Sequence, residues 1–372
     1  MNANLQRTPL YDRHVALGAK IVDFAGWSMP VQYDGLIAEH RRVRGHVGLF
    51  DVSHMGELYF EGAGAIATVD ELATNDVASL ADGQVLYTAL CNPQGGVRDD
   101  ALVYRLSDRA LLVVVNASNT EKIAAWARDH LQAATTLADV SSETALVAVQ
   151  GPRSRELLEG CRTIGPLATR LGKLPYYWFV RGDVGGKTMI VSRTGYTGEV
   201  GFEVFLPPEC AGDLWDELLA RGRTLGCGPV GLGARDTLRF EVCFCLYGHE
   251  LLEDVSPLEA GIGWTVKLKK ARFIGKDALV RQKESGIRRQ LVGFEIRGQE
   301  RAIARQGCEV RAAGRRVGVV TSGTFAPTLE RSLALALVDT EAVASSLAAV
   351  VRGREIPVER RPLPFHKPVA RD

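Results

Sequence analysis

Short apolar runs alternate along the chain with longer stretches in which apolar residues recur at helical spacing. The short runs are rich in Val, Leu and Tyr, and turn residues bound them, which predicts strands. Three such runs lie close together, over 84–91, 101–105 and 110–116. The turn sequences between them, at 92–96 and 107–108, suit hairpins rather than the long crossovers of a parallel sheet. We therefore expect antiparallel sheets.

Segments with apolar residues three and four positions apart lie between the groups of strands and predict helices. In one of them Leu214, Trp215, Leu218 and Leu219 follow the spacing of a single helix face. Because helices interrupt the runs of strands, the pattern favours an α+β architecture. The expected helices span 62–72, 119–130, 153–158, 211–225 and 276–285, and a further helix runs through Arg239.

The pattern changes after residue 285, where nearly every apolar run is a short strand and glycine turns separate the runs. A block of about 85 residues with this pattern has the size of a small barrel or sandwich. We place the boundary near Gly286, with a body over 1–285 and a β domain over 286–372. The strands expected in this domain span 290–296, 309–311, 316–321, 333–338, 350–351 and 355–358.

Composition narrows the class of protein. The 372 residues are enough for two or three domains with a large core. Hydrophobic residues make up 46% of the chain and charged residues 24%, as in ordinary folded soluble proteins. These values exclude a disordered chain and a bundle of membrane helices.

Charge is balanced over the chain but not along it. The formal net charge of +1 gives no chain-wide field for binding nucleic acid or a membrane surface, so we expect neither partner. From residue 286 to the end, 15 Lys and Arg stand against 9 Asp and Glu. This surplus has two interpretations: it aids solubility only, or it forms a patch that steers an acidic partner.

The first ten residues are polar and contain a proline. They lack the apolar run of a secretory signal and the arginine-rich amphipathic stretch of an organellar presequence. No apolar run in the sequence is long enough to cross a bilayer. We therefore expect a cytoplasmic protein.

The seven cysteines are an odd number spread over a long chain, which argues against a disulfide framework and for a reducing compartment. The sequence contains no Cys-x-x-Cys pair and no His-Glu-x-x-His motif, so the common zinc spacings are missing and we expect no metal. Cys243 and Cys245 alternate along an expected strand. Free cysteines are commonly small buried residues, so we expect these two in the core.

Asp99 and Asp100 are the first candidates for chemistry, in a Gly-Gly-Val-Arg-Asp-Asp sequence between two expected strands. Paired aspartates in a hairpin are also common as turn residues that bond to their own backbone. The apolar residues that follow draw Asp100 toward the interior, where an unpaired carboxylate is costly. Because neighbouring side chains of a strand point to opposite faces, we expect Asp100 alone to face a ligand, and substitution of Asp99 to leave most activity.

A second candidate segment spans 192–203 and has three glycines around Tyr196 and Glu199. It is either a hairpin with an ion pair or a site in which Glu203 accepts hydrogen bonds from an amino-heterocycle beside Tyr196. Arg235 stands where the helix through Arg239 should begin. It could bind an anionic ligand tail or pair with Asp236, and the Gly-x-Gly before it is too incomplete to indicate a Rossmann fold.

Several multi-residue motifs, taken together, resemble the T-proteins of the glycine cleavage system. The resemblance runs from Thr8 to Phe365 in order and spacing, and Trp264 belongs to it. Besides the two candidate segments and the stretch around Arg235, it includes the motifs at 23–30, 50–56, 115–117 and 257–261.

The resemblance implies a trefoil-like α+β body of two intimately joined domains with antiparallel sheets and helices, a C-terminal β-barrel, and a central ligand channel. It implies an aminomethyltransferase that takes the aminomethyl group from the lipoyl arm of the H-protein. Tetrahydrofolate accepts the methylene as 5,10-methylenetetrahydrofolate, and ammonia and dihydrolipoyl H-protein are released. The H-protein is thus the expected partner, with transient association with the other glycine cleavage components.

The resemblance also assigns residues. Asp100, the second aspartate of its motif, is the implied catalytic carboxylate. The implied folate contacts are Met55, Tyr87, Leu102, Tyr104, Asn116, Tyr196, Glu203, Arg235, Trp264 and Arg371. Arg371 is placed only by its nearness to the family's C-terminal arginine, because the tail after Phe365 diverges.

The chemistry needs a carboxylate but neither a metal nor a nucleophilic cysteine. A carboxylate beside the folate nitrogens can orient the acceptor, stabilise positive charge that develops on nitrogen and relay a proton. His54 is the rival base. It precedes Met55 and a glycine in what is also a hydrogen-bonded turn, and we expect it to be structural.

Two other functions fit the same fold. One is a folate-dependent demethylase of methylated amines or sulfonium compounds, which differs mainly in the donor pocket. The retained Asp99-Asp100 pair and the motif at 193–199 favour the glycine cleavage member. The other is a non-catalytic folate-binding factor for iron–sulfur assembly, whose relatives carry a Lys-Gly-Cys motif. The corresponding segment of this chain, 246–250, has no such cysteine.

Overall fold

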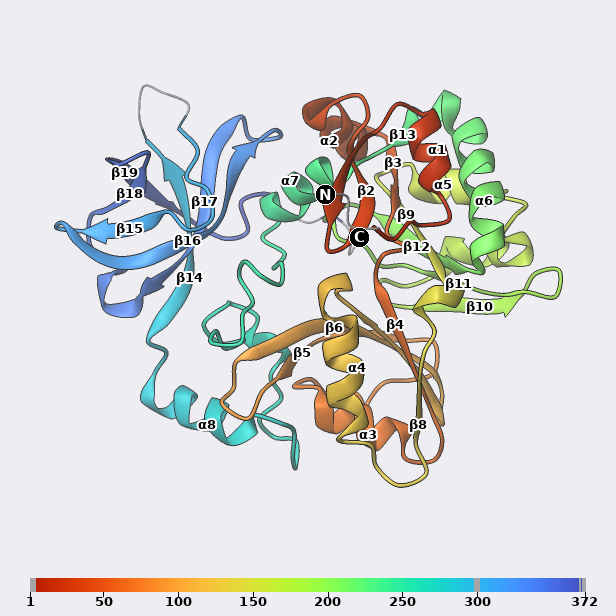
Figure 1. Cartoon of the computed structure of the whole chain (residues 1–372), viewed down its shortest axis with the longest axis horizontal. Coiled ribbons are helices and arrows are strands. Elements are labelled where there is room, and N and C mark those ends of the chain that lie inside the picture. The colour runs from red at the N-terminus through yellow and green to blue at the C-terminus, as the bar shows by residue number, and fades with distance from the viewer. Residues whose placement is uncertain (1–4, 298–301, 368, 370–372) are drawn as a thin grey trace.

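A five-stranded sheet forms the lower lobe of the molecule (Figure 1). The computed structural model describes residues 5–297, 302–367 and 369. The α3 helix (Ala65–Leu72) and the α4 helix (Thr120–Arg128) bury apolar side chains against one face of this sheet. The strands, in their order across the sheet, are β5 (Val85–Cys91), β6 (Val97–Ser107), β7 (Ala110–Val115), β4 (Gly56–Glu61) and β8 (Thr136–Asp139).

A six-stranded sheet forms the upper right lobe of Figure 1. The α5 helix (Ser154–Leu158) and the α6 helix (Pro208–Arg221) pack on one face of it. The α1 helix (Tyr11–Ala16), the hairpin β1 (Lys20–Phe24) and β2 (Trp27–Gln32), and α2 (Leu36–Gly45) precede its first strand. The strands, in order, are β10 (Phe179–Asp183), β11 (Thr188–Ser192), β12 (Gly201–Leu206), β9 (Ala145–Gln150), β3 (Val47–Asp51) and β13 (Cys227–Pro229).

The two sheets share an inner core, and strand alternation explains how. In β7, Leu111 and Val113 belong to the outer core under α3 and α4, whereas Leu112 and Val114 face the other way. They join Leu146 of β9 in one apolar cluster. Because β7 is buried on both faces, its sequence is a continuous apolar run rather than an alternating one.

The prediction of antiparallel sheets has one exception among the named strands. The β3 and β13 strands pair in parallel, with Val47 opposite Cys227. The α6 helix connects β12 to β13 and returns the chain to the edge of the sheet, where β13 runs in the same direction as β3. All other pairs of named strands are antiparallel.

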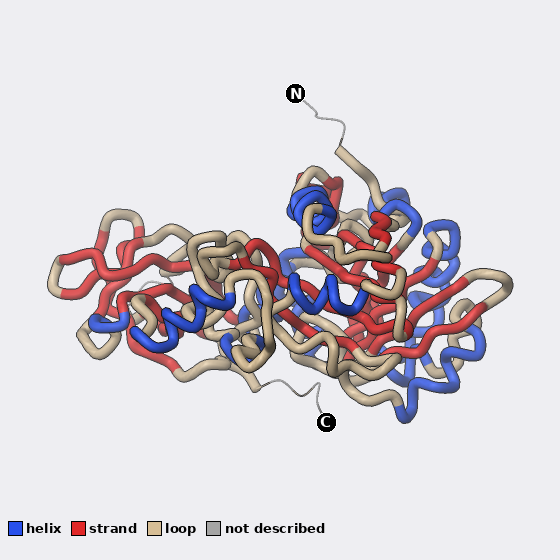
Figure 2. The backbone as a smooth tube through the Cα atoms, turned by 90° about the horizontal axis from the view of Figure 1, so that it is seen from below, coloured by secondary structure: helices blue, strands red, loops and turns tan. Residues whose placement is uncertain are grey.

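The C-terminal strands close into a barrel, shown at the left of Figure 1 and at one end of the molecule in Figure 2. The α8 helix (Lys276–Ser285) precedes it, and the division at Gly286 stays a prediction. Some of the basic side chains of this domain are paired, because Glu295 accepts hydrogen bonds from Arg331 and Arg361. Around the barrel the order is β14 (Arg289–Ile296), β17 (Arg331–Asp339), β16 (Arg315–Ala326), β15 (Glu309–Ala312), β18 (Leu347–Val351) and β19 (Arg354–Arg361).

The barrel is hydrogen-bonded to a buried ion pair of the preceding body. Arg239 of α7 (Leu232–Glu241) donates a hydrogen bond of 2.9 Å to Glu250 and another of 2.9 Å to the hydroxyl of Ser322 in β16. Both charged side chains are almost entirely buried. Strand β16 of the barrel therefore contacts both buried charges, through the hydroxyls of Ser322 and Thr321.

The strand expected through Cys243 and Cys245 is wrong. Both residues lie in a turn and loop after α7, and Cys243 has a φ of 58°, in the left-handed region. Cys245 is buried, as expected, whereas Cys243 is only partly buried. In the parts of the chain that the structure describes, no helix is both long and apolar enough to span a bilayer.

Candidate functional site

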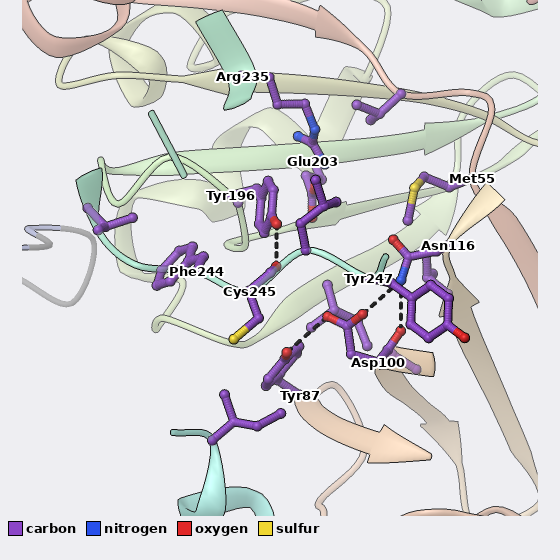
Figure 3. A pocket seen from close by; sticks show the side chains of 18 of the residues that line it. Met55, Tyr87, Asp100, Asn116, Tyr196, Glu203, Arg235, Phe244, Cys245 and Tyr247 are labelled. Carbon is purple, nitrogen blue, oxygen red and sulfur yellow. Dashed lines mark hydrogen bonds between the residues drawn. The ribbon is translucent and has the colours of Figure 1, made fainter. Parts of the chain in front are cut away.

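A cavity of about 730 Å³ lies beside the inner core, where the two sheets meet the loop after α7. Ten of the eleven residues that the resemblance assigns line it, although they come from widely separated parts of the chain. Figure 3 labels seven of the ten. The eleventh, Arg371, lies outside the described residues. The ten are Met55, Tyr87, Asp100, Leu102, Tyr104, Asn116, Tyr196, Glu203, Arg235 and Trp264.

Asp100 reaches the cavity from β6, on the strand face that it shares with Leu102 and Tyr104. Two donors hold its carboxylate: the Tyr87 hydroxyl lies 2.9 Å from Oδ2, and the Asn116 amide nitrogen lies 2.8 Å from Oδ1. Burial raises the pKa of Asp100, and the two hydrogen bonds oppose that rise. The carboxyl is therefore fixed in place and holds a proton more readily than an exposed aspartate.

Asp99 is fully buried and does not line the cavity. Its Oδ1 accepts hydrogen bonds from the side-chain amides of Asn116, at 2.7 Å, and Asn119, at 2.8 Å. Its Oδ2 accepts the backbone N–H of Asn116 at 3.1 Å. Burial and the neighbouring charge of Asp100 raise the pKa of Asp99 to about 7. The aspartate pair is thus joined through one shared asparagine.

Glu203 presents a second carboxylate to the cavity, from β12. The Thr194 hydroxyl donates a hydrogen bond of 2.5 Å to its Oε2. Burial raises the pKa of Glu203, and the hydrogen bond from Thr194 opposes the rise. Because the structure gives Glu203 no ion pair among the described residues, its remaining lone pairs can accept N–H groups of a ligand.

Arg235 is a cation beside this carboxylate. Its guanidinium lies 4.7 Å from the centre of the Tyr196 ring, and the Tyr196 hydroxyl donates to the Cys245 carbonyl oxygen. The alternative pairing of Arg235 with Asp236 is wrong, because Asp236 accepts from Arg239 at 2.8 Å. Burial lowers the pKa of the Arg235 guanidinium, and a ligand oxygen would compensate that burial.

Aromatic side chains provide flat walls. The Trp264 side chain lies in the short helical turn Gly263–Thr265, and its ring centre is 5.8 Å from that of Tyr87. Trp264 is 58% exposed, so it stands at the rim of the cavity rather than within it. Met55 and Leu102 add apolar contact surface. The cavity can therefore hold a flat heterocycle that bears several N–H groups.

The sequence interpretation missed part of the lining. His54 was expected to be structural; it does lie in a turn, but its buried ring also lines the cavity, in edge contact with Phe24. Its Nδ1 has no hydrogen-bond partner in the described chain. Burial lowers the pKa of His54 to about 4. Tyr247 also lines the cavity, and the Lys122 ammonium donates a hydrogen bond of 2.8 Å to its hydroxyl.

The described residues contain no group of three or more His, Cys, Asp and Glu side chains that could hold a metal ion. The expectation that the protein needs no metal stays a prediction. The groups that the cavity does offer are two buried carboxylates, an amide, a guanidinium and aromatic rings. Such a set suits hydrogen bonding and proton transfer with an amine or an amino-heterocycle.

Two family models match the chain. The first, described as the GCVT N-terminal domain, covers residues 10–270, and the second, the glycine cleavage T-protein C-terminal barrel domain, covers residues 289–367. Two curated relatives, both called aminomethyltransferase, are 47% identical to this chain. The Halothermothrix orenii protein aligns over 97% of this chain and 100% of its own length, and the Desulforamulus reducens protein over 98% of each.

A solved structure is similar over almost the whole chain. It is the crystal structure of glycine cleavage system aminomethyltransferase T from Bartonella henselae, which superposes with a TM-score of 0.90 at 32% sequence identity. The superposition covers 98% of this chain and 99% of that one. The likeness therefore includes both the cavity-bearing lobes and the barrel.

Proposed function

The chain belongs to the glycine cleavage T-protein family and is an aminomethyltransferase, and we propose that its cavity binds tetrahydrofolate with Asp100 as the catalytic carboxylate. The methylene of the aminomethyl group on the lipoyl arm of the H-protein passes to tetrahydrofolate. The products are 5,10-methylenetetrahydrofolate, ammonia and dihydrolipoyl H-protein. When bound, tetrahydrofolate supplies the nucleophilic nitrogen that accepts the methylene.

The residues of the cavity fit such a ligand. A volume of about 730 Å³ lies within the range of ligand pockets for molecules of this size. Glu203 is placed to accept the amino and ring N–H groups of a pterin, and the Tyr196 ring provides a flat contact next to it. Arg235 is placed to donate to an oxygen of the same ligand.

Asp100 supports three tasks at the reacting nitrogen. It accepts a hydrogen bond and so orients the acceptor, and its negative charge stabilises positive charge that develops on nitrogen. Because burial raises its pKa, it also takes up and returns a proton more readily near neutral pH than an exposed aspartate. Tyr87 and Asn116 keep the carboxylate in one orientation during these steps.

The observation that carries the proposal is the double anchoring of Asp100 at the wall of this cavity. The test is a transfer assay with the purified chain, tetrahydrofolate and H-protein that carries an aminomethylated lipoyl arm. We expect formation of 5,10-methylenetetrahydrofolate together with equimolar ammonia. Failure to form either product with a folded chain contradicts the proposal.

The same assay distinguishes an aminomethyltransferase from the alternative enzyme, a folate-dependent demethylase. A folate-dependent demethylase would use a methylated amine or a sulfonium compound as donor, so these donors are offered in parallel. Relatives called aminomethyltransferase at 47% identity over nearly the full chain support the aminomethyl donor. They also support an enzyme rather than a non-catalytic assembly factor.

The partner protein and the cellular location of this chain are proposals. A family defined by the glycine cleavage system supports work with that system's other components, and we propose the lipoylated H-protein as the direct partner. The cytoplasmic location and the absence of nucleic-acid and membrane partners stay predictions from the sequence.

A further inference from the structure

Asn116 is held between two carboxylates. Its side-chain nitrogen lies 2.7 Å from Oδ1 of Asp99 and 2.8 Å from Oδ1 of Asp100. An amide nitrogen has two hydrogens, so these two acceptors use both of them. The reverse orientation would bring the amide oxygen against two carboxylate oxygens and is excluded by repulsion. The contacts therefore fix which end of the amide is which, without reference to any ligand.

The amide oxygen of Asn116 is thereby directed away from the aspartates. Figure 3 shows the nitrogen of Asn116 toward Asp100 and the oxygen on the opposite side, toward Met55. Among the described residues no donor to this oxygen is found, and Asn116 lines the cavity. The oxygen is an open acceptor beside the second acceptor, Asp100. Two adjacent acceptors recognise a ligand that brings N–H donors.

Asp99 is one of the two carboxylates that fix this orientation, and Asp100 is the other. Asp99 binds Asn116 twice, through the backbone N–H at 3.1 Å and the side-chain amide at 2.7 Å, and its hydrogen-bond partners in the described chain are all donors. A carboxylate can accept from all of them at once. An asparagine at position 99 would turn one N–H group toward one of these donors, and rotation of the Asn116 amide would be the way to relieve the conflict.

We propose that Asp99 is a positioning residue that acts through Asn116, setting the open amide oxygen of Asn116 as an acceptor for the N–H groups of reduced folate. This inference rests on the proposed function. Strand alternation alone led to the expectation that substitution of Asp99 leaves most activity, and this proposal replaces that expectation. Asp99 does face away from the cavity, but it reaches the site through a residue that follows the next strand.

Folate binding tests the orientation without turnover. Tetrahydrofolate has N–H groups at N5 and N8, whereas in folic acid both nitrogens lack hydrogen and are acceptors. The wild-type chain should bind tetrahydrofolate more tightly than folic acid. In Asp99→Asn only Asp100 still holds the nitrogen of Asn116, so the amide oxygen is less firmly directed to the cavity. The preference should therefore fall by about tenfold, as expected when one hydrogen bond worth ~1.4 kcal/mol is lost.

The matched control is Asn119→Ala, which removes one donor to Asp99 but leaves both contacts to Asn116. This variant should keep the wild-type preference even if its melting temperature falls. A purely structural role for Asp99 weakens both folates equally, so an unchanged binding ratio in Asp99→Asn contradicts the inference.

A double-mutant cycle on the transfer rate gives the second measurement. Asp99→Asn should lower kcat by about 100-fold in the wild-type background, because misplacement at the site is costly. In an Asn116→Ala background the same change should lower kcat less than about threefold, because the route of action is gone. Multiplicative losses contradict the inference. A wild-type chain that binds folates but transfers no methylene contradicts the proposed function, while the binding ratio still tests Asp99.

Discussion

The Tyr87 hydroxyl donates a 2.9 Å hydrogen bond to Oδ2 of Asp100, from the neighbouring strand of the same sheet. This bond stabilises the ionised form of Asp100 and so lowers a pKa that burial raises. In Tyr87→Phe the carboxylate loses that support, and its pKa should rise further. The acidic limb of the pH profile for kcat should therefore move to higher pH, with a loss in kcat of about tenfold at neutral pH.

The control for this change is Tyr59→Phe, because Tyr59 lies on β4 of the same sheet and is not among the residues that line the cavity. Its profile should match that of the wild type. A Tyr87→Phe profile that keeps the wild-type acidic limb shows that Tyr87 does not set the protonation of Asp100.

Glu203 is expected to anchor the ligand by accepting N–H groups. Glu203→Gln keeps the shape but replaces an acceptor oxygen with a donor, so tetrahydrofolate binding should weaken by about 1.5–3 kcal/mol, the usual range for hydrogen bonds to charged groups. Calorimetric titration measures this directly. The exposed Glu209, changed to Gln, serves as the control and should bind folate normally. Equal affinities for the Glu203 variant and the wild type would leave Glu203 a strand residue only.

The buried ion pair between Arg239 and Glu250, to which β16 of the barrel is hydrogen-bonded, should contribute strongly to stability. Glu250→Gln leaves a buried guanidinium with only the half-exposed Asp236 as a charged partner, which should cost about 3 kcal/mol in the free energy of unfolding. Urea denaturation measures the loss. Glu355→Gln, which breaks the more exposed pair with Arg311, should cost less than about 1 kcal/mol. Equal losses for the two variants would mean that burial of the first pair is not decisive.

His54 gives a pH dependence of known sign. Its pKa is lowered by burial to about 4 in the folded chain, below the ordinary value of 6.5. Between about pH 6.5 and pH 4 the unfolded chain therefore binds a proton that the folded chain does not, so falling pH destabilises the fold, by up to about 3 kcal/mol. In His54→Gln this contribution should disappear. The measurement is the free energy of unfolding of both chains at several pH values between about 6.5 and 4. If it falls equally with pH in the wild type and in His54→Gln, His54 is not a neutral, buried side chain.

Much of the fold could be predicted from the sequence because the signals are local. The turn residues at 92–96 separate two apolar runs, and β5 and β6 form on either side of them. The α8 helix spans the residues that its pattern predicts. In the same way, the glycine turns after Gly286 separate the strands of the barrel.

Other features depend on residues that are distant in sequence. The parallel pair of β3 and β13 joins segments almost 180 residues apart, and no local pattern encodes that register. The strand expected at Cys243 failed because alternating apolar residues occur in a buried loop as well as in a strand.

In the candidate site, too, the sequence predicted features with a local signal and not contacts between distant side chains. Motifs identified ten of the residues that line the cavity, including Asp100 and Glu203, although their roles stay predictions. Strand alternation placed Asp99 on the other face, and the structure agrees with that placement. Its link to Asn116 could not be predicted, because it depends on the position of a side chain 17 residues later, at the end of the next strand. The position of the His54 ring at the cavity wall could not be predicted either, because the ring packs against Phe24, which is distant in sequence.

If Asp100 is the catalytic carboxylate, single-turnover methylene transfer should be far slower in Asp100→Asn than in the wild type. The amide keeps the shape and a hydrogen bond, so tetrahydrofolate should still bind with only a modest loss of affinity. The rate of 5,10-methylenetetrahydrofolate formation from aminomethylated H-protein should fall by roughly 10²–10⁴, the range for a positioned acid–base group. A folded Asp100→Asn chain that binds tetrahydrofolate and transfers the methylene at the wild-type rate would contradict the account.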